Sequence, residues 1–90
     1  RHLGISVNHD FAMVEPDHLL ALMHEVAAAR PQAITTFCTN LRAAALAERV
    51  EAELDIPLLD TVSTTVWGQL RAAGADPAQV RGWGRLFGWR

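Results

Sequence analysis

The sequence predicts an α/β domain in which a parallel three-stranded sheet is flanked by helices. Three short apolar segments, residues 3–7, 32–38 and 56–59, have the composition of strands, and each precedes a longer segment with helical spacing of apolar residues. Strands that alternate with helices along a chain are joined by right-handed crossovers and therefore run parallel. The chain of 90 residues has room for one such domain.

The first strand and helix are indicated near the N-terminus. Leu3, Ile5 and Val7 alternate with small residues, which is typical of a short strand, and polar turn residues follow from Asn8. Pro16 suits the first turn of a helix. The residues after it give this helix one apolar face, made of Leu19, Leu22, Met23 and Val26.

The second and third units follow the same order. Residues 32–38 form an unbroken apolar and β-branched run, as in a strand that is covered on both faces. We expect a second helix over about 40–54, a third strand over 56–59 and a third helix over about 63–73, closed by Gly74. The third helix is expected to point four residues inward: Val62, Val66, Trp67 and Leu70.

The chain is expected to have two parts, an α/β half-domain over residues 1–75 and an aromatic C-terminal tail over residues 76–90. The tail contains Trp83, Phe87 and Trp89, which is too apolar for an ordinary solvated terminus. We therefore expect it to pack on the same half or on a partner half.

Composition excludes several classes of function. The net charge of −2 gives no electrostatic basis for binding nucleic acid. No apolar run approaches the roughly 20 residues that span a membrane, so we expect no membrane partner. Because a lone cysteine cannot form an internal disulfide, the sequence favours a reducing compartment, and we expect a cytoplasmic location.

Cys38 is the only cysteine, and it lies where the second predicted strand meets the second predicted helix. This position is the carboxyl edge of a parallel sheet, beside the free N–H groups of a helix N-terminus, a setting that favours a thiolate and binds anions. The pattern indicates one half of a small-molecule site built around a thiolate and a carboxylate. The structural alternative is that Cys38 is a small buried apolar residue.

Other polar residues are weaker candidates for a site. Thr61, Ser63 and Thr64 follow the third predicted strand on the same sheet edge as Cys38, where they could bind substrate or cap the third helix. The four histidines have no spacing that forms a closed ligand set, so we expect no metal site. Trp67 and Trp83 are expected to be core or interface anchors.

Three motifs carry a resemblance to a known family. They are Cys38-Thr39-Asn40-Leu41-Arg42, then Ile56-Pro57-Leu58-Leu59-Asp60-Thr61 followed by Trp67, Leu70, Arg71, Ala73 and Gly74, and finally Gly82-Trp83-Gly84-Arg85-Leu86-Phe87. In these motifs the chain resembles the C-terminal part of the maleate cis-trans isomerase and arylmalonate decarboxylase group of the aspartate/glutamate racemase superfamily. The resemblance covers nearly the whole chain.

The resemblance implies cofactor-free chemistry at the carbon next to a carboxylate, with a small carboxylate or dicarboxylate as substrate. In the isomerases a thiolate adds to the double bond of maleate, the central bond rotates and fumarate leaves. Cys38 corresponds to the general acid/base opposite that nucleophile. In the decarboxylases a cysteine at this position protonates an enediolate, and in the racemases two cysteines exchange protons on opposite faces of a carbon.

The resemblance also assigns substrate-binding residues. Thr39 and the N–H groups that follow it would hold a carboxylate, Asn40 lies beside them, and Asn8 matches an asparagine that binds the substrate carboxylate in the isomerases. Each has a structural alternative, since Asn8 suits a turn and both Thr39 and Asn40 are ordinary helix caps. Capping is the favoured role for Asn40, and substrate contact is the favoured role for Thr39.

The resemblance further implies an architecture of two similar α/β halves related by a pseudo-twofold axis, with the site between them. This chain corresponds to the C-terminal half, so we expect its partner to be a missing N-terminal half or a second copy. The expected function is that of a maleate-to-fumarate type isomerase. The alternatives are an arylmalonate-type decarboxylase, an amino-acid racemase, or a non-catalytic interaction module.

Overall fold

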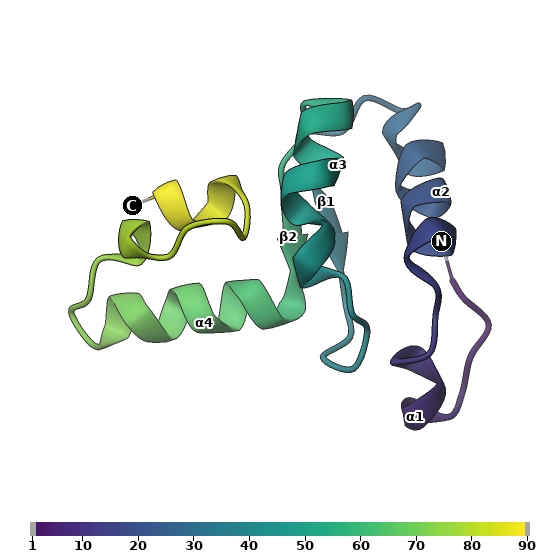
Figure 1. Cartoon of the computed structure of the whole chain (residues 1–90), viewed down its shortest axis with the longest axis horizontal. Helices are drawn as coiled ribbons and strands as arrows, with labels where there is room; N and C mark the ends of the chain where they lie inside the picture. The colour runs from purple at the N-terminus through teal and green to yellow at the C-terminus, as the bar shows by residue number, and fades with distance from the viewer. Residues whose placement is uncertain (1, 90) are drawn as a thin grey trace.

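The computed structural model describes residues 2–89 and has an α/β architecture, which confirms the predicted fold class (Figure 1). Its helices are α1 (Asn8–Phe11), α2 (Pro16–Ala27), α3 (Ala47–Leu54) and α4 (Thr61–Ala72), with short 3₁₀ turns η1 (Ala44–Leu46), η2 (Pro77–Gln79) and η3 (Arg85–Gly88). Its strands are β1 (Ile34–Thr36) and β2 (Leu58–Asp60). They pair in parallel, with Ile34 opposite Leu58 and Thr36 opposite Asp60.

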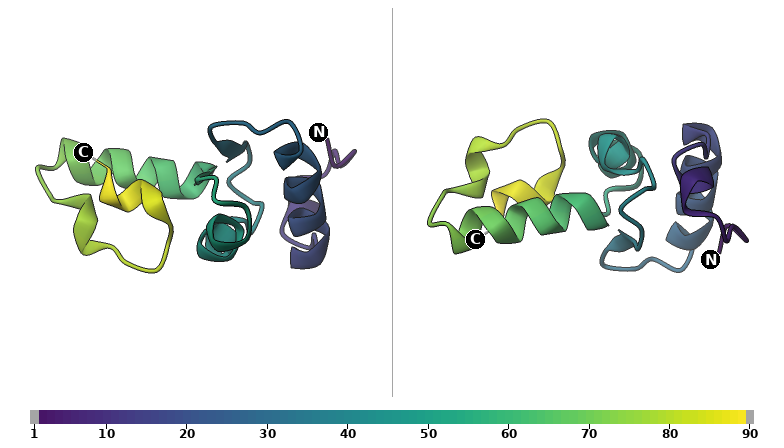
Figure 2. Two further views of the ribbon diagram at one scale, coloured as in Figure 1. Left: turned by 90° about the horizontal axis from the view of Figure 1, so that it is seen from above. Right: turned by 90° about the horizontal axis from the view of Figure 1, so that it is seen from below.

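The main hydrophobic core lies between α2, the two strands and α3. Seen from above and below, α4 and the C-terminal turns form a second group of elements beside this one (Figure 2). Each buried core residue is apolar and comes from α2, β1, β2, α3 or the loop before α3: Leu19, Leu20, Met23, Ile34, Leu41, Ala43, Ala47, Val50 and Leu58. The pattern of α2 predicted this face, because Leu19 and Met23 are both buried.

The prediction that residues 3–7 form the first of three strands is wrong for the part of the chain that the structure describes, where the sheet has two strands. Gly4 has a φ of +72°, which an extended strand does not adopt, and Val7 is exposed. Leu3 still packs against the core, although without strand pairing. Apolar alternation over five residues was therefore not enough to form a strand.

The second predicted helix begins later than residue 40. Residues 39–43 form an irregular loop that buries Leu41 and Ala43 in the core, and the regular helix α3 starts only at Ala47. The Ala43 N–H donates to the Leu41 carbonyl oxygen at 2.9 Å, which tightens this loop. Burial of two apolar side chains here outweighs the helix start that Asn40 predicted.

The inward face of α4 also differs from the prediction. Val62 and Val66 are exposed, whereas Trp67 and Leu70 are half-buried. The Asp60 carboxylate caps this helix by accepting the N–H groups of Val62 and Ser63, and Ser63 is the buried residue of α4.

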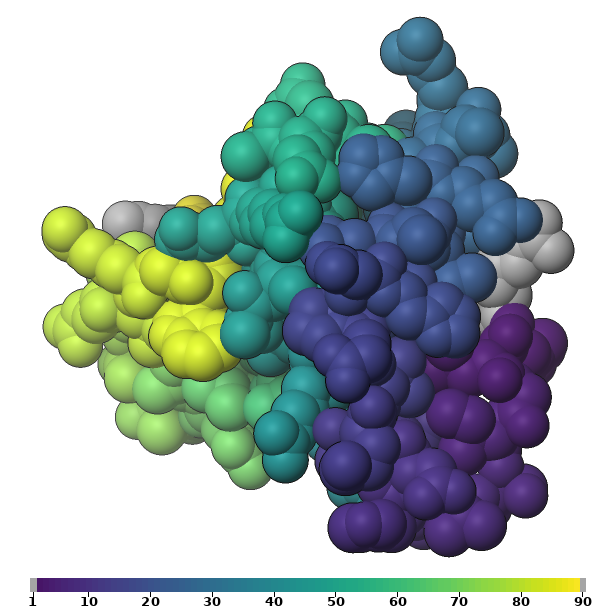
Figure 3. Space-filling view, turned by 45° about the vertical axis from the view of Figure 1, so that its right-hand side comes forward, coloured from purple at the N-terminus to yellow at the C-terminus, as the bar shows by residue number. Residues whose placement is uncertain are grey.

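The C-terminal residues fold back onto α3 and α4. Leu86 and Phe87 of η3 are buried, and the Trp67 indole N–H donates to the Trp89 carbonyl oxygen at 3.3 Å. In the space-filling view the yellow C-terminal turns lie against the teal part of the chain (Figure 3). No helix within residues 2–89 is long and apolar enough to cross a membrane.

Candidate active site

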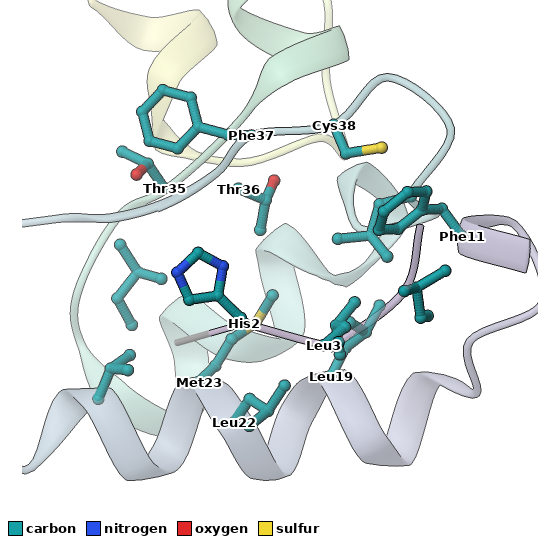
Figure 4. Close-up of a pocket in the computed structure, with 15 residues that line it drawn as sticks. His2, Leu3, Phe11, Leu19, Leu22, Met23, Thr35, Thr36, Phe37 and Cys38 are labelled. Atoms are coloured by element: carbon teal, nitrogen blue, oxygen red, sulfur yellow. The ribbon is translucent and has the colours of Figure 1, made fainter. Parts of the chain in front are cut away.

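Cys38 lies two residues beyond the end of β1, on the rim of an open pocket of about 660 Å³. The pocket lies between α2 and β1, and most of the side chains around it are apolar, among them Phe11, Leu22 and Met23 (Figure 4). Cys38 is half-buried and its thiol is free. The Cys38 sulfur and the Phe37 ring point to different sides of the chain, and Phe37 is 91% exposed.

The backbone around Cys38 is held by Thr61, the first residue of α4. The Cys38 N–H donates to the Thr61 hydroxyl oxygen at 3.2 Å, and the same hydroxyl donates to the Thr36 carbonyl oxygen. A single side chain from the β2–α4 junction thus binds the chain on both sides of Phe37. These bonds attach the loop that carries Cys38 to the start of α4.

Asp60 lies beneath this junction and is fully buried, at 0% exposure. Its carboxylate accepts the Thr36 hydroxyl at 2.7 Å, the Val62 N–H at 2.9 Å and the Ser63 N–H at 3.3 Å. A buried carboxylate is costly unless donors surround it, and here three donors do so. Because Thr36 and Asp60 are register partners, this bond also joins β1 to β2.

Asn8 and Asn40 come together although they are 32 residues apart in the sequence. The Asn40 side-chain amide donates to the Asn8 carbonyl oxygen at 3.2 Å. Thr39 and Asn40 follow Cys38 in the chain, and Asn8, Thr39 and Asn40 are all exposed. The N-terminal turn is therefore attached to the loop that carries Cys38, and the predicted site residues lie in one region.

The helix that was expected to begin beside Cys38 is absent from that position, so the expected cap and its N–H groups are not there. Neither η1 nor α3 has a side-chain cap, and Asn40 is bonded to Asn8 instead. The helix start that is joined to Cys38 is that of α4, through Thr61. The location of Cys38 at the carboxyl end of a strand agrees with the sequence analysis, but the helix beside it is a different one.

A family model for arylmalonate decarboxylase matches residues 1–87. The chain belongs to the arylmalonate decarboxylase family. It is therefore a member of an enzyme family of the decarboxylase and racemase type. The chain matches no curated protein and no solved structure at a significant level.

Two residues that hold the loop of this arylmalonate decarboxylase family member, Asp60 and Thr36, were not identified from the sequence. Thr36 was placed in the second predicted strand without a polar role, and Asp60 follows the third predicted strand, where it was given no role. The signal that could have found Asp60 is an aspartate directly after an apolar strand and directly before a helical pattern, which is a typical N-cap position. Nothing in the sequence indicated that the Thr36 hydroxyl would reach it across the sheet.

Of the four histidines, His2 lines the pocket that Cys38 borders, and the other three are not among its lining residues. Within residues 2–89 no group of three or more His, Cys, Asp or Glu side chains could hold a metal ion. His24 instead contacts Glu53 of α3, with 2.9 Å between its Nε2 and the carboxylate. The hydrogen bond from His24, followed by that from Arg49, lowers the pKa of Glu53 below its ordinary value.

Proposed function

We propose that this chain supplies the acid/base residue of a cofactor-independent enzyme that transfers a proton at the carbon next to a carboxylate. Cys38 is the proposed general acid/base. The single observation that supports this most is the family match over residues 1–87, which includes Cys38 and the motif after it. The position of Cys38 at a strand end, on the rim of a pocket, is compatible with that role.

Decarboxylation is the reaction that the family match favours. The bond between the α-carbon of a substituted malonate and one carboxyl group breaks, and carbon dioxide leaves. The electron pair stays behind as an enediolate on the remaining carboxylate. The Cys38 thiol then gives its proton to the α-carbon and becomes a thiolate, which water reprotonates. The apolar side chains around the pocket, such as Phe11 and Met23, suit an aromatic substituent.

Isomerisation of maleate to fumarate is the second candidate, and the resemblance of Asn8 to an asparagine that binds the substrate carboxylate in the isomerases favours it. A nucleophile outside this chain would add to the double bond, and Cys38 would exchange a proton on the opposite side. Rotation about the central bond and expulsion of the nucleophile would then give fumarate. Racemisation of an amino acid is the third candidate reaction. It also requires one reacting group outside this chain and Cys38 on the opposite side of the substrate.

We also propose that a second α/β half, or a second copy of this chain, completes the site. A reaction that builds charge on a carboxylate needs donors that already point at it. In this chain Thr39, Asn40 and Asn8 are the candidate donors, and all three are exposed. A second half would cover them and supply further donors. A cytoplasmic location, which the lone free thiol favours, is part of the same proposal.

The test is a substrate panel given to the enzyme that contains this chain together with its completing half. Phenylmalonate, maleate and an amino-acid enantiomer are supplied without metal or cofactor, and products are followed by nuclear magnetic resonance. We expect conversion of one of the three. Conversion of none of them would contradict the proposal and favour a non-catalytic interaction module.

A further inference from the structure

We propose that Thr61 is a positioning residue for Cys38, an inference that rests on the proposed function of Cys38. Cys38 lies beyond the last register pair of β1, so the strand ladder does not hold its backbone. The Thr61 hydroxyl takes over that task, because it accepts the Cys38 N–H and donates to the Thr36 carbonyl oxygen. One hydroxyl group therefore fixes the chain before and after Phe37.

Thr61 is itself rigidly placed. It follows Asp60, whose buried carboxylate binds the Thr36 hydroxyl and the first N–H groups of α4. The position of the Thr61 hydroxyl is thus determined by β1, β2 and α4 together. A reacting group must be held in a narrow geometry, since a misplacement of about 1 Å can lower a rate by roughly 100-fold. The arrangement at Thr61 supplies such support to Cys38.

Substitutions of Thr61 can distinguish its positioning of Cys38 from its contribution to the stability of the fold. Thr61→Val keeps the shape of the side chain and removes both hydrogen bonds, whereas Thr61→Ser keeps the hydroxyl. Thr65→Val is the matched control on the same helix, because the exposed Thr65 hydroxyl donates only to the Thr61 carbonyl oxygen, at 2.8 Å. All three variants retain Asp60 as the helix cap.

The first measurement is amide hydrogen exchange in the 90-residue chain, followed residue by residue. The Cys38 amide is expected to exchange roughly fivefold to tenfold faster in Thr61→Val, and at the wild-type rate in Thr61→Ser and Thr65→Val. The Leu58 amide, which donates to Glu51 at 3.0 Å, is the internal reference and should not change. Either of two results would overturn the proposal: a Cys38 amide that is unprotected in the wild type, or one that is equally protected in Thr61→Val. The first result does not depend on the folding of the variant.

The second measurement is turnover by the enzyme that contains this chain. We expect Thr61→Val to lower kcat by about tenfold or more with little change in KM, and Thr61→Ser to restore it. A normal kcat in Thr61→Val, despite faster exchange at Cys38, would show that Thr61 holds the loop without positioning a reacting group, and would overturn the proposal. If the wild type itself converts no substrate, the proposed function fails, and exchange at Cys38 alone decides whether Thr61 fixes its backbone.

Discussion

At the scale of single residues, Asp60 determines how the site region is assembled. Its carboxylate is fully buried and accepts three hydrogen bonds, one from Thr36 and two from the backbone of α4. The bond to Thr36 joins the strands, and the backbone bonds begin the helix. Thr61, next in the chain, then binds the Cys38 backbone. The loop that carries Cys38 therefore depends on the polar cluster of Asp60, Thr36 and Thr61.

Asp60→Ala is expected to destabilise the chain by about 2–4 kcal/mol, since it removes a helix cap and leaves the half-buried Thr36 hydroxyl without its acceptor. Asp76→Ala is the matched control, because Asp76 also caps a helical turn, through the Ala78 N–H at 3.0 Å, but is exposed. Asp76→Ala should lower the free energy of unfolding by less than about 1 kcal/mol. Urea unfolding followed by circular dichroism measures both, and equal losses for the two variants would contradict this account.

At the scale of elements, α3 connects the sheet to the C-terminal turns through Glu51. This buried carboxylate accepts the Leu58 N–H of β2 at 3.0 Å and the Arg85 N–H of η3 at 2.9 Å. Gly84 allows the close approach of the two segments, because its φ is +109° and a Cβ there would lie 3.0 Å from the Ala47 Cβ. The glycine before Arg85 is therefore a packing requirement of the C-terminal motif.

Gly84→Ala is expected to lower the free energy of unfolding by about 1–3 kcal/mol through backbone strain and the clash with α3. Gly88→Ala provides the comparison, since nothing lies within 4 Å of a Cβ at Gly88 and its φ is not positive. That substitution should change stability by no more than about 0.5 kcal/mol. Thermal unfolding of the two variants distinguishes them, and a neutral Gly84→Ala would show that η3 is not packed closely on α3.

The contact between α2 and α3 predicts a pH dependence. The pKa of Glu53 is lowered by hydrogen bonds from His24 and Arg49, so its charged form is favoured in the folded state. This contribution is present above the ordinary glutamate pKa and is lost as the pH falls through the lowered value. Wild type should therefore lose slightly more stability than Glu53→Gln between about pH 6 and pH 3. The stability of Glu48→Gln, a variant on the same helix, should change with pH as that of the wild type does. If the stability of Glu53→Gln had the same pH dependence as both, the prediction would be contradicted.

Sequence patterns predicted the elements that rest on apolar periodicity. The face of α2 and its start at Pro16 follow from local sequence, and the parallel pairing of β1 with β2 follows from the alternation of strands with helices along the chain. The patterns failed where long-range contacts decide the outcome. Asn40 binds Asn8 and does not cap a helix, and residues 3–7 do not pair. The hydrogen bonds of Thr61 connect residues 23 to 25 positions apart, which no local spacing encodes.

At the scale of the whole molecule, several large apolar side chains of the chain are exposed to solvent. The exposed residues Phe37, Val62 and Val66 come from the β1 end and from α4, and Trp83 and Trp89 lie in the C-terminal turns. Among the described residues each of the two strands has a partner on one side only. Unpaired strand edges and exposed aromatic residues are typical of surfaces that contact another chain.

The chain is therefore expected to associate, either with a completing half or with a second copy. In a sample of the 90-residue chain alone, the expected partner is a second copy. Multi-angle light scattering over a range of concentrations measures this, and a dimer mass should appear as the concentration rises. At concentrations where it is monomeric, the chain should convert no maleate, because the opposing group is proposed to lie outside the chain. A monomer at high concentration, or measurable fumarate from the monomeric chain, would contradict this proposal.

The central claim is that Cys38 transfers the proton, and turnover by a Cys38→Ser enzyme tests it most directly. Serine retains the size of the side chain but is a far weaker acid at neutral pH, so the proton transfer is lost while the fold is kept. The comparison uses the enzyme that contains this chain, with circular dichroism to verify the fold and Thr65→Val as a control that removes a nearby exposed hydroxyl. The account predicts that Cys38→Ser and Cys38→Ala abolish conversion of the accepted substrate and that Thr65→Val does not. A folded Cys38→Ser enzyme that turns over at the wild-type rate would contradict it.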